Sequence, residues 1–367
     1  MASGDSPDDP ERKLRYGWTT GACAAGAARA AAEALLTGRF PDPVSITLPR
    51  GQTPVFALGR KELSAGRATA GIVKDAGDDP DVTHGALICT TVERGPAGSG
   101  VTFRAGEGVG TVTRPGLPLP PGEPAINPKP REQIQQALRD AVVAAGMSGT
   151  ELDFIVTVSI PGGAELARKT LNSRLGIVGG LSVLGTTGIV VPFSCAAWIH
   201  SIHRGIDVAR AAGLAHIAAS TGSTSEAAIQ ALYRLDETAL IDMGDFAGGM
   251  LKYLRSHPVP RLTIAGGFGK LTKLAAGHLD LHSGRSQVDV AGLAACMKDL
   301  GLPAERVAAA TQAASAGEVL KIAGADGGRL AELVARRARD VALATLAGET
   351  AVDVAVFDRA GALLGQS

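Results

Sequence analysis

The hydrophobic pattern of the first third of the chain predicts one helix followed by a set of short strands. An alanine-rich run over residues 21–37 follows Thr19 and Thr20, which can cap a helix, and it stops at Gly38, a residue type that favours helix ends. We expect a largely antiparallel sheet after this helix. Over residues 44–113 the apolar residues form short β-rich runs between Gly, Pro and Asp clusters, namely VSITL, PVFALG, RATAGIV, HGALICTTV, VTFRA and GVGTV.

The rest of the chain alternates between helix and strand patterns. A proline-rich segment over residues 114–132 leads into a helix expected over 131–145 and a strand expected over 152–160. Beyond Cys195 helices and strands alternate, which implies a parallel sheet flanked by helices. The sequence Ser223-Thr224-Ser225-Glu226 has the pattern of a capping box. The expected helices span 199–212, 226–234, 246–254 and 270–276, and the expected strands span 215–220, 239–241, 261–265 and 351–358.

Composition narrows the class of protein. A length of 367 residues corresponds to about two domains, and 48 glycines with only 4% aromatic residues are typical of an α/β enzyme. Because 36 Lys and Arg balance 36 Asp and Glu, we expect no nucleic acid partner. Residues 1–13 form a polar tail, and no apolar run approaches the ~18 residues of a membrane span, so we expect a cytoplasmic protein with no membrane contact. The cysteines are too far apart for a zinc ribbon and are interpreted as thiols in a reducing compartment: Cys23, Cys89, Cys195 and Cys296.

The densest group of ionisable side chains is the sequence KDAGDDPDVTHG of residues 74–85, between two predicted strands. One interpretation is an active-site loop in which Asp75, Asp78, Asp79 or His84 moves a proton, since crowded like charges raise the pKa of at least one carboxyl group. A second interpretation is a hard-cation site, because Asp clusters suit Ca²⁺ or Mg²⁺. A third is an Asx-rich surface turn.

In the second half, predicted strands end in loops of glycine and small polar residues. Ligands bind at the carboxyl ends of parallel strands, where glycines expose backbone N–H groups and helix N-termini favour negative groups. This favours a nucleotide-like cofactor, although any turn of this kind also uses Gly and Ser for its own geometry. The loops are Ser220-Thr221-Gly222-Ser223-Thr224, Asp242-Met243-Gly244-Asp245-Phe246 and Ala265-Gly266-Gly267-Phe268-Gly269-Lys270.

Two other motifs are incomplete. The sequence GGFGK has Ile264 where a P-loop has its first glycine, and Leu271 where it has a Mg²⁺-binding Ser or Thr, which disfavours ATP hydrolysis. His278 and His282 have the spacing of a helical metal-ligand pair but lack the Glu of a zincin motif. We interpret them as capping or hydrogen-bonded histidines and expect no protein-bound metal.

Seven blocks occur in order between residue 14 and about residue 290: LRYGWTTGACAAGAARAA, ITLPRG, AGIVKDAGDDPDVTHG, GEPAINPKPRE, TLNSRLGIVGGLSVLGTTGIVVP, STGST and GKLTKLAAGHLDLHS. Together they resemble the CbiD family of cobalt-precorrin-5B (C1)-methyltransferases. The resemblance implies methyl transfer from S-adenosylmethionine to ring carbon C1 of an anionic cobalt-corrinoid intermediate in cobalamin biosynthesis. It also implies two domains after the tail of residues 1–13: an α+β domain over 14–195 and a Rossmann-like α/β domain over 196–367.

The resemblance also suggests residues that bind the substrate. The carboxylates of the macrocycle need basic partners, and the N-terminus of the first helix can hold a further carboxylate or serve only as a cap. The predicted substrate-binding residues are Lys74, Arg174, Lys270, Lys273, Thr19, Thr20 and Gly21.

The same resemblance assigns the donor and the chemistry. The adenosine of the methyl donor is expected against two loops of the second domain, with Asp242 or Asp245 toward the ribose. The residues expected to transfer a ring proton or to stabilise the positive sulfonium are Asp75, Asp78, Asp79 and His84. The chain departs from the family pattern at Gly244-Asp245-Phe246, where Gly-Asn-Phe is usual, and at Gly267-Phe268-Gly269-Lys270, where His-Pro-Gly-Lys is usual. The predicted cofactor-binding residues are Ser220, Thr221, Gly222, Asp242, Gly244 and Asp245.

Two other functions remain open on the sequence: a non-catalytic carrier of a tetrapyrrole intermediate, and a metal-dependent hydrolase that uses the Asp-rich loop or His278 and His282. A carrier would not bind S-adenosylmethionine, and a chelator would inactivate only the hydrolase. The sequence also leaves open a homo-oligomer.

Overall fold

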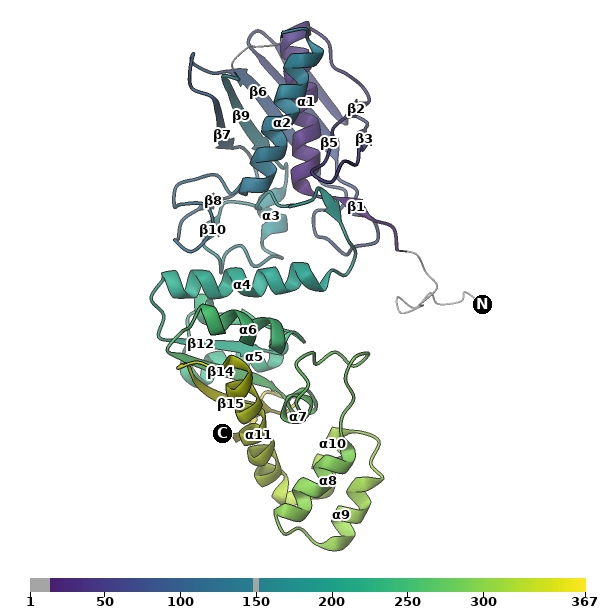
Figure 1. Cartoon of the computed structure of the whole chain (residues 1–367), viewed down its shortest axis with the longest axis vertical. Helices are drawn as coiled ribbons and strands as arrows, with labels where there is room; N and C mark the ends of the chain where they lie inside the picture. Colours follow the sequence, from purple (N-terminus) through teal and green to yellow (C-terminus); the bar gives the residue numbers. More distant parts are fainter. Residues whose placement is uncertain (1–13, 148–151) are drawn as a thin grey trace, which may run out of the picture. The chain divides into compact units, whose positions relative to one another are not determined.

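The computed structural model describes residues 14–147 and 152–367 of a mixed α/β protein (Figure 1). The chain divides into two compact units, unit 1 over Met1–Ser194 and unit 2 over Cys195–Ser367. The predicted tail of residues 1–13 lies outside the described residues.

Unit 1 is built on a five-stranded sheet with two long helices packed on it (Figure 1). The strand order is β4-β5-β6-β9-β7, and all neighbours are antiparallel except β7 and β9. This confirms the largely antiparallel sheet expected from the sequence. The strands are β4 (Arg60–Ser64), β5 (Arg67–Val73), β6 (Leu87–Arg94), β7 (Val101–Ala105) and β9 (Phe154–Ser159), and the helices are α1 (Thr20–Thr37) and α2 (Pro128–Ala144).

Helix α1 lies in the core of unit 1 because its side chains are small. Its alanines are fully buried between α2 and strands β5 and β6. At Gly26 an added Cβ would lie 2.8 Å from Ile72 Cδ1 and 2.9 Å from Phe56 Cδ2, so a side chain there would have to displace its neighbours. The Thr19 hydroxyl accepts the Ala22 N–H at 3.1 Å, and Gly38 ends the helix with φ +80°. The predicted helix is therefore confirmed, with its start one residue earlier.

Three of the six predicted β-rich runs, RATAGIV, HGALICTTV and VTFRA, form strands of this sheet, whereas VSITL, PVFALG and GVGTV lie in separate two-stranded sheets. Strands β5 and β7 match their runs at both ends, whereas β4 was not predicted because its sequence RKELS is charged. Strand β4 is an exposed edge strand, and charged residues on an edge discourage pairing with other chains. Short elements complete unit 1: β1 (Gly17–Trp18) pairs with β11 (Ile189–Val190), β2 (Val44–Ser45) with β3 (Val55–Phe56), and β8 (Thr111–Val112) with β10 (Ile177–Val178), and α3 is Gly163–Ala167.

Unit 2 contains a second five-stranded sheet, in the order β13-β12-β14-β15-β16. The first four strands are parallel, as the alternating pattern predicted, and β16 is antiparallel to β15. The chain leaves β12 toward β13 on one side and returns to β14 on the other, so the strand order reverses between β12 and β14. The strands are β12 (His216–Ser220), β13 (Leu240–Asp242), β14 (Arg261–Gly267), β15 (Ala351–Phe357) and β16 (Leu363–Gln366).

Helices cover both faces of this sheet. Helix α5 packs on one face over β12, β14 and β15, while α7 and α11 pack on the other face, and α11 also contacts α6. Helices α8, α9 and α10 form a separate group beside α11 (Figure 1). The helices are α4 (Cys195–Ala211), α5 (Ser223–Tyr233), α6 (Ala247–Ser256), α7 (Phe268–Ala275), α8 (Val290–Asp299), α9 (Ala304–Thr311), α10 (Ala316–Ala323) and α11 (Gly327–Leu346).

One local prediction for unit 2 is wrong, and the spacing of two histidines does not correspond to a helix. The capping box at Ser223 does not form, because α5 begins at that residue; Gly222 takes the cap position, and no side-chain hydrogen bond caps the helix. His278 and His282 do not share a helix, because α7 ends at Ala275 and α8 begins at Val290. Their spacing therefore does not place both rings on one helical face.

Candidate active site

Polar groups at the N-terminus of α1 already have hydrogen-bond partners within unit 1. The Gly21 N–H donates to the Leu184 carbonyl at 2.8 Å, and the Thr20 hydroxyl accepts the Leu184 N–H at 3.0 Å. Gly21 is required there, since an added Cβ would lie 2.9 Å from the Leu184 oxygen. Together with the Thr19 cap, these bonds account for all three residues structurally. Substrate binding by Thr19, Thr20 and Gly21 stays a prediction, and a ligand would compete with these bonds.

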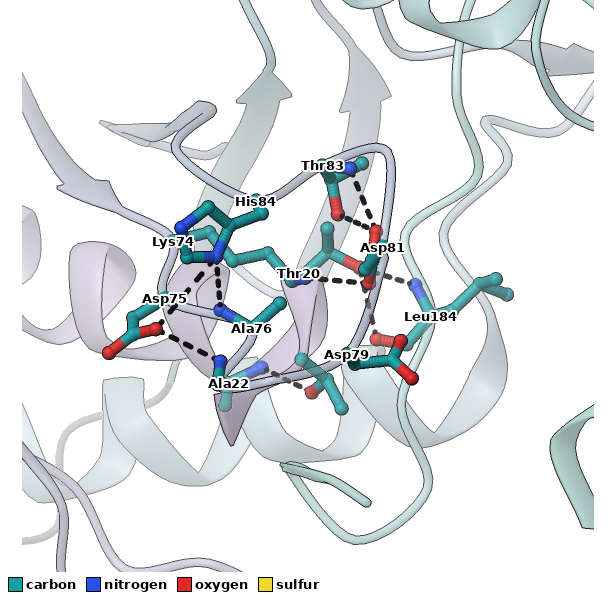
Figure 2. A network of polar contacts seen from close by, with 12 residues as sticks. Thr20, Ala22, Lys74, Asp75, Ala76, Asp79, Asp81, Thr83, His84 and Leu184 are labelled. Carbon is teal, nitrogen blue, oxygen red and sulfur yellow. Dashed lines mark hydrogen bonds and ion pairs between the residues drawn. The ribbon is translucent and has the colours of Figure 1, made fainter. Parts of the chain in front are cut away.

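The loop of residues 74–85 is organised around a buried ion pair (Figure 2). The Lys74 side chain is 1% exposed, and its Nζ lies 2.7 Å from Asp81 Oδ2. Asp81 Oδ1 accepts the Thr83 N–H at 2.8 Å and the Thr83 hydroxyl at 2.6 Å. Burial alone would raise the pKa of Asp81, but the hydrogen bonds from Lys74 and Thr83 outweigh it and hold the pKa below its usual range. Lys74 is thus buried inside the loop, where it contacts Asp81.

Asp75 joins the loop to the start of the described chain. It forms a two-pronged ion pair with the Arg15 guanidinium, with Arg15 Nη2 3.0 Å from Oδ1, and Oδ1 also accepts the Gly77 N–H at 2.9 Å. The Arg15 hydrogen bond, followed by that of Gly77, lowers the pKa of Asp75 to about 2. For Asp75 and Asp81 the pKa direction is therefore opposite to that expected from crowding of like charges, and both are weak bases.

Asp78 and Asp79 each accept a backbone N–H. Asp78 Oδ2 accepts the Arg15 N–H at 2.8 Å, and Asp79 Oδ1 accepts the Phe193 N–H at 2.9 Å. Phe193 has φ +55°, an uncommon value for a bulky residue. At Gly77, an added Cβ would lie 2.1 Å from the Arg15 oxygen. The loop and the segment around Arg15 are therefore in tight contact.

His84 accepts a backbone hydrogen bond at the opposite end of this loop (Figure 2). The Ala76 N–H donates to His84 Nδ1 at 3.1 Å, and Asp75 Oδ1 lies 3.9 Å from the same nitrogen. About half of the His84 side chain, 53%, is exposed. The four predicted catalytic residues share one loop, as their sequence positions imply, and the structure shows that each of them accepts a hydrogen bond from a backbone N–H: Asp75, Asp78, Asp79 and His84.

Two residues of this region were not predicted. Arg15 binds two loop aspartates that lie 60 and 63 residues away in the sequence, and only its position in the first sequence block pointed to it. Gln133 of α2 donates from Nε2 to the Gly185 carbonyl at 3.1 Å, while its buried Oε1 has no hydrogen-bond partner within the described chain. Contacts between residues so far apart in the sequence leave no local sequence pattern that could predict them.

The carboxyl edge of the unit 2 sheet brings together two of the predicted cofactor loops. Ser220, Asp242 and Ala265 lie side by side in the parallel register of β12, β13 and β14. The Ser220 side chain is 1% exposed, and no group of the described residues bonds its hydroxyl. The Thr221 N–H donates to the Ala265 carbonyl at 3.0 Å, and Gly222 has open space where a Cβ would lie.

The predicted residues Asp245, Lys270 and Lys273 form a second cluster of unit 2. Lys270 Nζ forms an ion pair with Asp245, and Lys273 Nζ donates to the Leu281 carbonyl at 3.1 Å. The Leu281 N–H in turn donates to the Asp245 carbonyl at 2.9 Å. Burial, followed by the charge of Lys270, lowers the pKa of Lys273. These contacts hold the segment after α7 against the loop before α6.

Two predicted site residues remain, Gly244 in unit 2 and Arg174 in unit 1. Gly244 has φ +54° and sits against Trp198, whose indole N–H donates to the Asp242 carbonyl at 3.2 Å. Arg174 is half-buried in unit 1, between α3 and β10. Cys23, Cys89 and Cys296 are buried, and burial raises the pKa of the Cys23 thiol to about 12.

Over residues 14–147 and 152–367, no group of three or more His, Cys, Asp or Glu side chains is arranged to hold a metal ion. In the same part of the chain, no helix is both long and apolar enough to cross a membrane.

Comparison with known proteins gives matches along the chain. Residues 7–192 match the family model described as CbiD, and residues 280–367 match the model described as CbiD, C-terminal domain. A relative from Bradyrhizobium sp., named cobalt-precorrin-5B C(1)-methyltransferase, is 62% identical over 363 residues, which is 99% of this chain and 96% of the relative. A relative of the same name from Paramagnetospirillum magneticum is 59% identical over 97% of this chain and 99% of its own. A crystal structure of the cobalamin biosynthesis protein cbiD from Archaeoglobus fulgidus is 27% identical, with a TM-score of 0.40 over 79% of this chain and 85% of that one.

Proposed function

Because the chain belongs to the CbiD family, we propose that it transfers a methyl group from S-adenosylmethionine to carbon C1 of cobalt-precorrin-5B. It is a methyltransferase of cobalamin biosynthesis, like the relatives that it matches at 58–62% identity over nearly its full length. That full-length identity is the observation that carries the function. Neither the carrier nor the metal-dependent hydrolase is favoured by an observation of its own.

We place the methyl donor at the carboxyl edge of the unit 2 sheet, as in a Rossmann-like domain. In open α/β sheets ligands bind outside the carboxyl ends of the strands, where the strand order reverses. Here this point lies between β12 and β14, next to the Ser220-Thr221-Gly222 loop. The buried Ser220 hydroxyl lacks a partner in the described chain, as expected for a group that bonds a ligand.

The residues of this edge suit a nucleoside and an amino-acid carboxylate. Helix α5 has no side-chain cap, so its first N–H groups favour a negative group, and Gly222 leaves room for a ligand to approach. Asp242 lies in register with Ser220, and we propose that its carboxylate faces the ribose hydroxyls. When bound, S-adenosylmethionine supplies a methyl group activated by its sulfonium. The protein then has to align donor and acceptor and to exclude water.

We propose that the loop of residues 74–85 in unit 1 contacts the anionic macrocycle. The aspartates of this loop bond Arg15, Lys74 and backbone N–H groups, and these contacts define its conformation. Lys74 supports this loop and does not itself reach the substrate, because it is 1% exposed. We also expect the enzyme to work in the cytoplasm.

The reaction is tested by incubating the protein with S-adenosylmethionine and cobalt-precorrin-5B and measuring the molecular mass of the product by mass spectrometry. A gain of one methyl group is expected, and an unchanged mass would contradict the function.

The donor site is tested by calorimetry with S-adenosylhomocysteine. Ser220→Ala should weaken binding about 2- to 10-fold, the worth of one neutral hydrogen bond. Thr350→Val is the matched control, because Thr350 is also a buried hydroxyl without a partner in the described chain but precedes β15, at the opposite end of the sheet. It should bind the ligand like the wild type. Equal affinities in all three proteins would place the donor elsewhere.

A further inference from the structure

The hydrogen bond at His84 determines which ring nitrogen carries a proton. A backbone N–H can only donate, so the nitrogen that receives the Ala76 N–H at 3.1 Å, His84 Nδ1, must present a lone pair. The neutral ring therefore carries its proton on Nε2. A base at Nε2 is excluded by that proton, and a base at Nδ1 would first have to break the bond to Ala76.

The Nε2–H group of His84 is a side-chain donor that the loop itself does not use. Within residues 14–147 and 152–367, Nε2 has no hydrogen-bond partner, and 53% of the side chain is exposed. The aspartates around it are already engaged: Asp75 with Arg15, Asp81 with Lys74, and Asp79 with the Phe193 N–H. These bonds fix the position from which His84 can donate.

We propose that His84 is a substrate-binding residue whose Nε2–H donates to a carboxylate of the corrinoid macrocycle, and that it is not a base in the reaction. This inference rests on the proposed function, which supplies a ligand rich in acetate and propionate groups. Asp75 Oδ1 lies 3.9 Å from Nδ1, the nitrogen that accepts the Ala76 N–H.

Two substitutions separate the two nitrogens of the ring. In His84→Asn the amide oxygen can replace Nδ1 as acceptor of the Ala76 N–H, but the distal donor is lost. In His84→Gln the amide nitrogen can replace Nε2–H as donor, while the bond to Ala76 is lost. The readouts are the Kd of cobalt-precorrin-5B without methyl donor, KM and kcat for methyl transfer, and the midpoint of urea unfolding.

His84→Asn should weaken corrinoid binding about 10- to 100-fold, as for a hydrogen bond to a charged group, with the unfolding midpoint and the KM of S-adenosylmethionine unchanged. His84→Gln should bind the corrinoid more tightly than His84→Asn. Wild-type corrinoid affinity in His84→Asn would overturn the proposal. An equal loss of kcat in both variants with unchanged Kd would also overturn it and assign a base. Because Kd is measured without turnover, failure of the proposed reaction would be seen separately, as a wild-type protein that transfers no methyl group.

Discussion

The buried pair of Lys74 and Asp81 gives the sharpest test of how unit 1 is held together. Lys74 is 1% exposed and Asp81 27% exposed, so Asp81→Asn leaves an ammonium group buried without a counter-charge. Breaking such a pair costs about 3–5 kcal/mol, and because Asp81 is partly exposed we expect the lower end of this range, a loss of about 3 kcal/mol in the free energy of unfolding. For a unit of this size that corresponds to a drop in melting temperature of about 6–12 °C.

The reverse change should cost less. Lys74→Met keeps most of the buried stem and leaves Asp81 bonded to both donors of Thr83, so we expect a loss of about 1–2 kcal/mol. The double variant should be more stable than Asp81→Asn alone, because it contains no uncompensated buried charge.

Tryptophan fluorescence can report unit 1 by itself. The chain has two tryptophans, Trp18 in unit 1 and Trp198 in unit 2. The Trp18 ring packs against Phe56, with 5.8 Å between the ring centroids. In a Trp198→Phe background, unfolding seen by Trp18 gives the cost of each variant. If Lys74→Met costs more than Asp81→Asn, or if the two losses simply add, the buried-charge argument is refuted. If Lys74→Met lowers methyl transfer but leaves stability unchanged, Lys74 instead contacts substrate, as the family resemblance first suggested.

The same pair predicts a pH dependence. The folded state holds the pKa of Asp81 below its usual range, so its contribution to stability is present above the unfolded value of about 3.9 and is lost as the pH falls through the folded pKa. The double variant should lack this part of the acid sensitivity.

Two further predictions test packing and burial. Gly77→Ala and Gly85→Ala both place Ala at positive φ, +69° and +76°, but only the first brings Cβ to 2.1 Å from the Arg15 oxygen; in urea unfolding, Gly85→Ala should cost about 1–2 kcal/mol and Gly77→Ala clearly more, and equal costs would contradict the close contact. Burial and the hydrogen bond to Asp207 raise the pKa of Tyr253 to about 12, so its contribution to stability is lost as the pH rises from about 10 through 12. In an ultraviolet titration Tyr253→Phe should remove the highest tyrosine step, and an unchanged curve would refute the assignment.

Local patterns were sufficient where hydrogen bonds stay within a segment. The Thr19 cap, the alanine run and Gly38 define α1, and the β-rich runs of β5 and β7 end where Gly, Pro and Asp interrupt them. The parallel character of the unit 2 sheet also followed from alternation. Strand β4 was not predicted, because its charged residues suit an exposed edge and show no alternation of apolar and polar positions.

The sequence blocks alone determined the family, and they placed the predicted catalytic residues in a single loop. Only the tertiary structure decided which groups each side chain contacts there, because a partner distant in sequence leaves no periodic trace. Lys74 was expected to bind substrate, but in the folded protein it is buried against Asp81. Asp75 is kept ionised by Arg15, which lies 60 residues earlier in the chain. Local residue order specifies backbone conformation through nearby hydrogen bonds, whereas charge state and exposure depend on the whole packed environment.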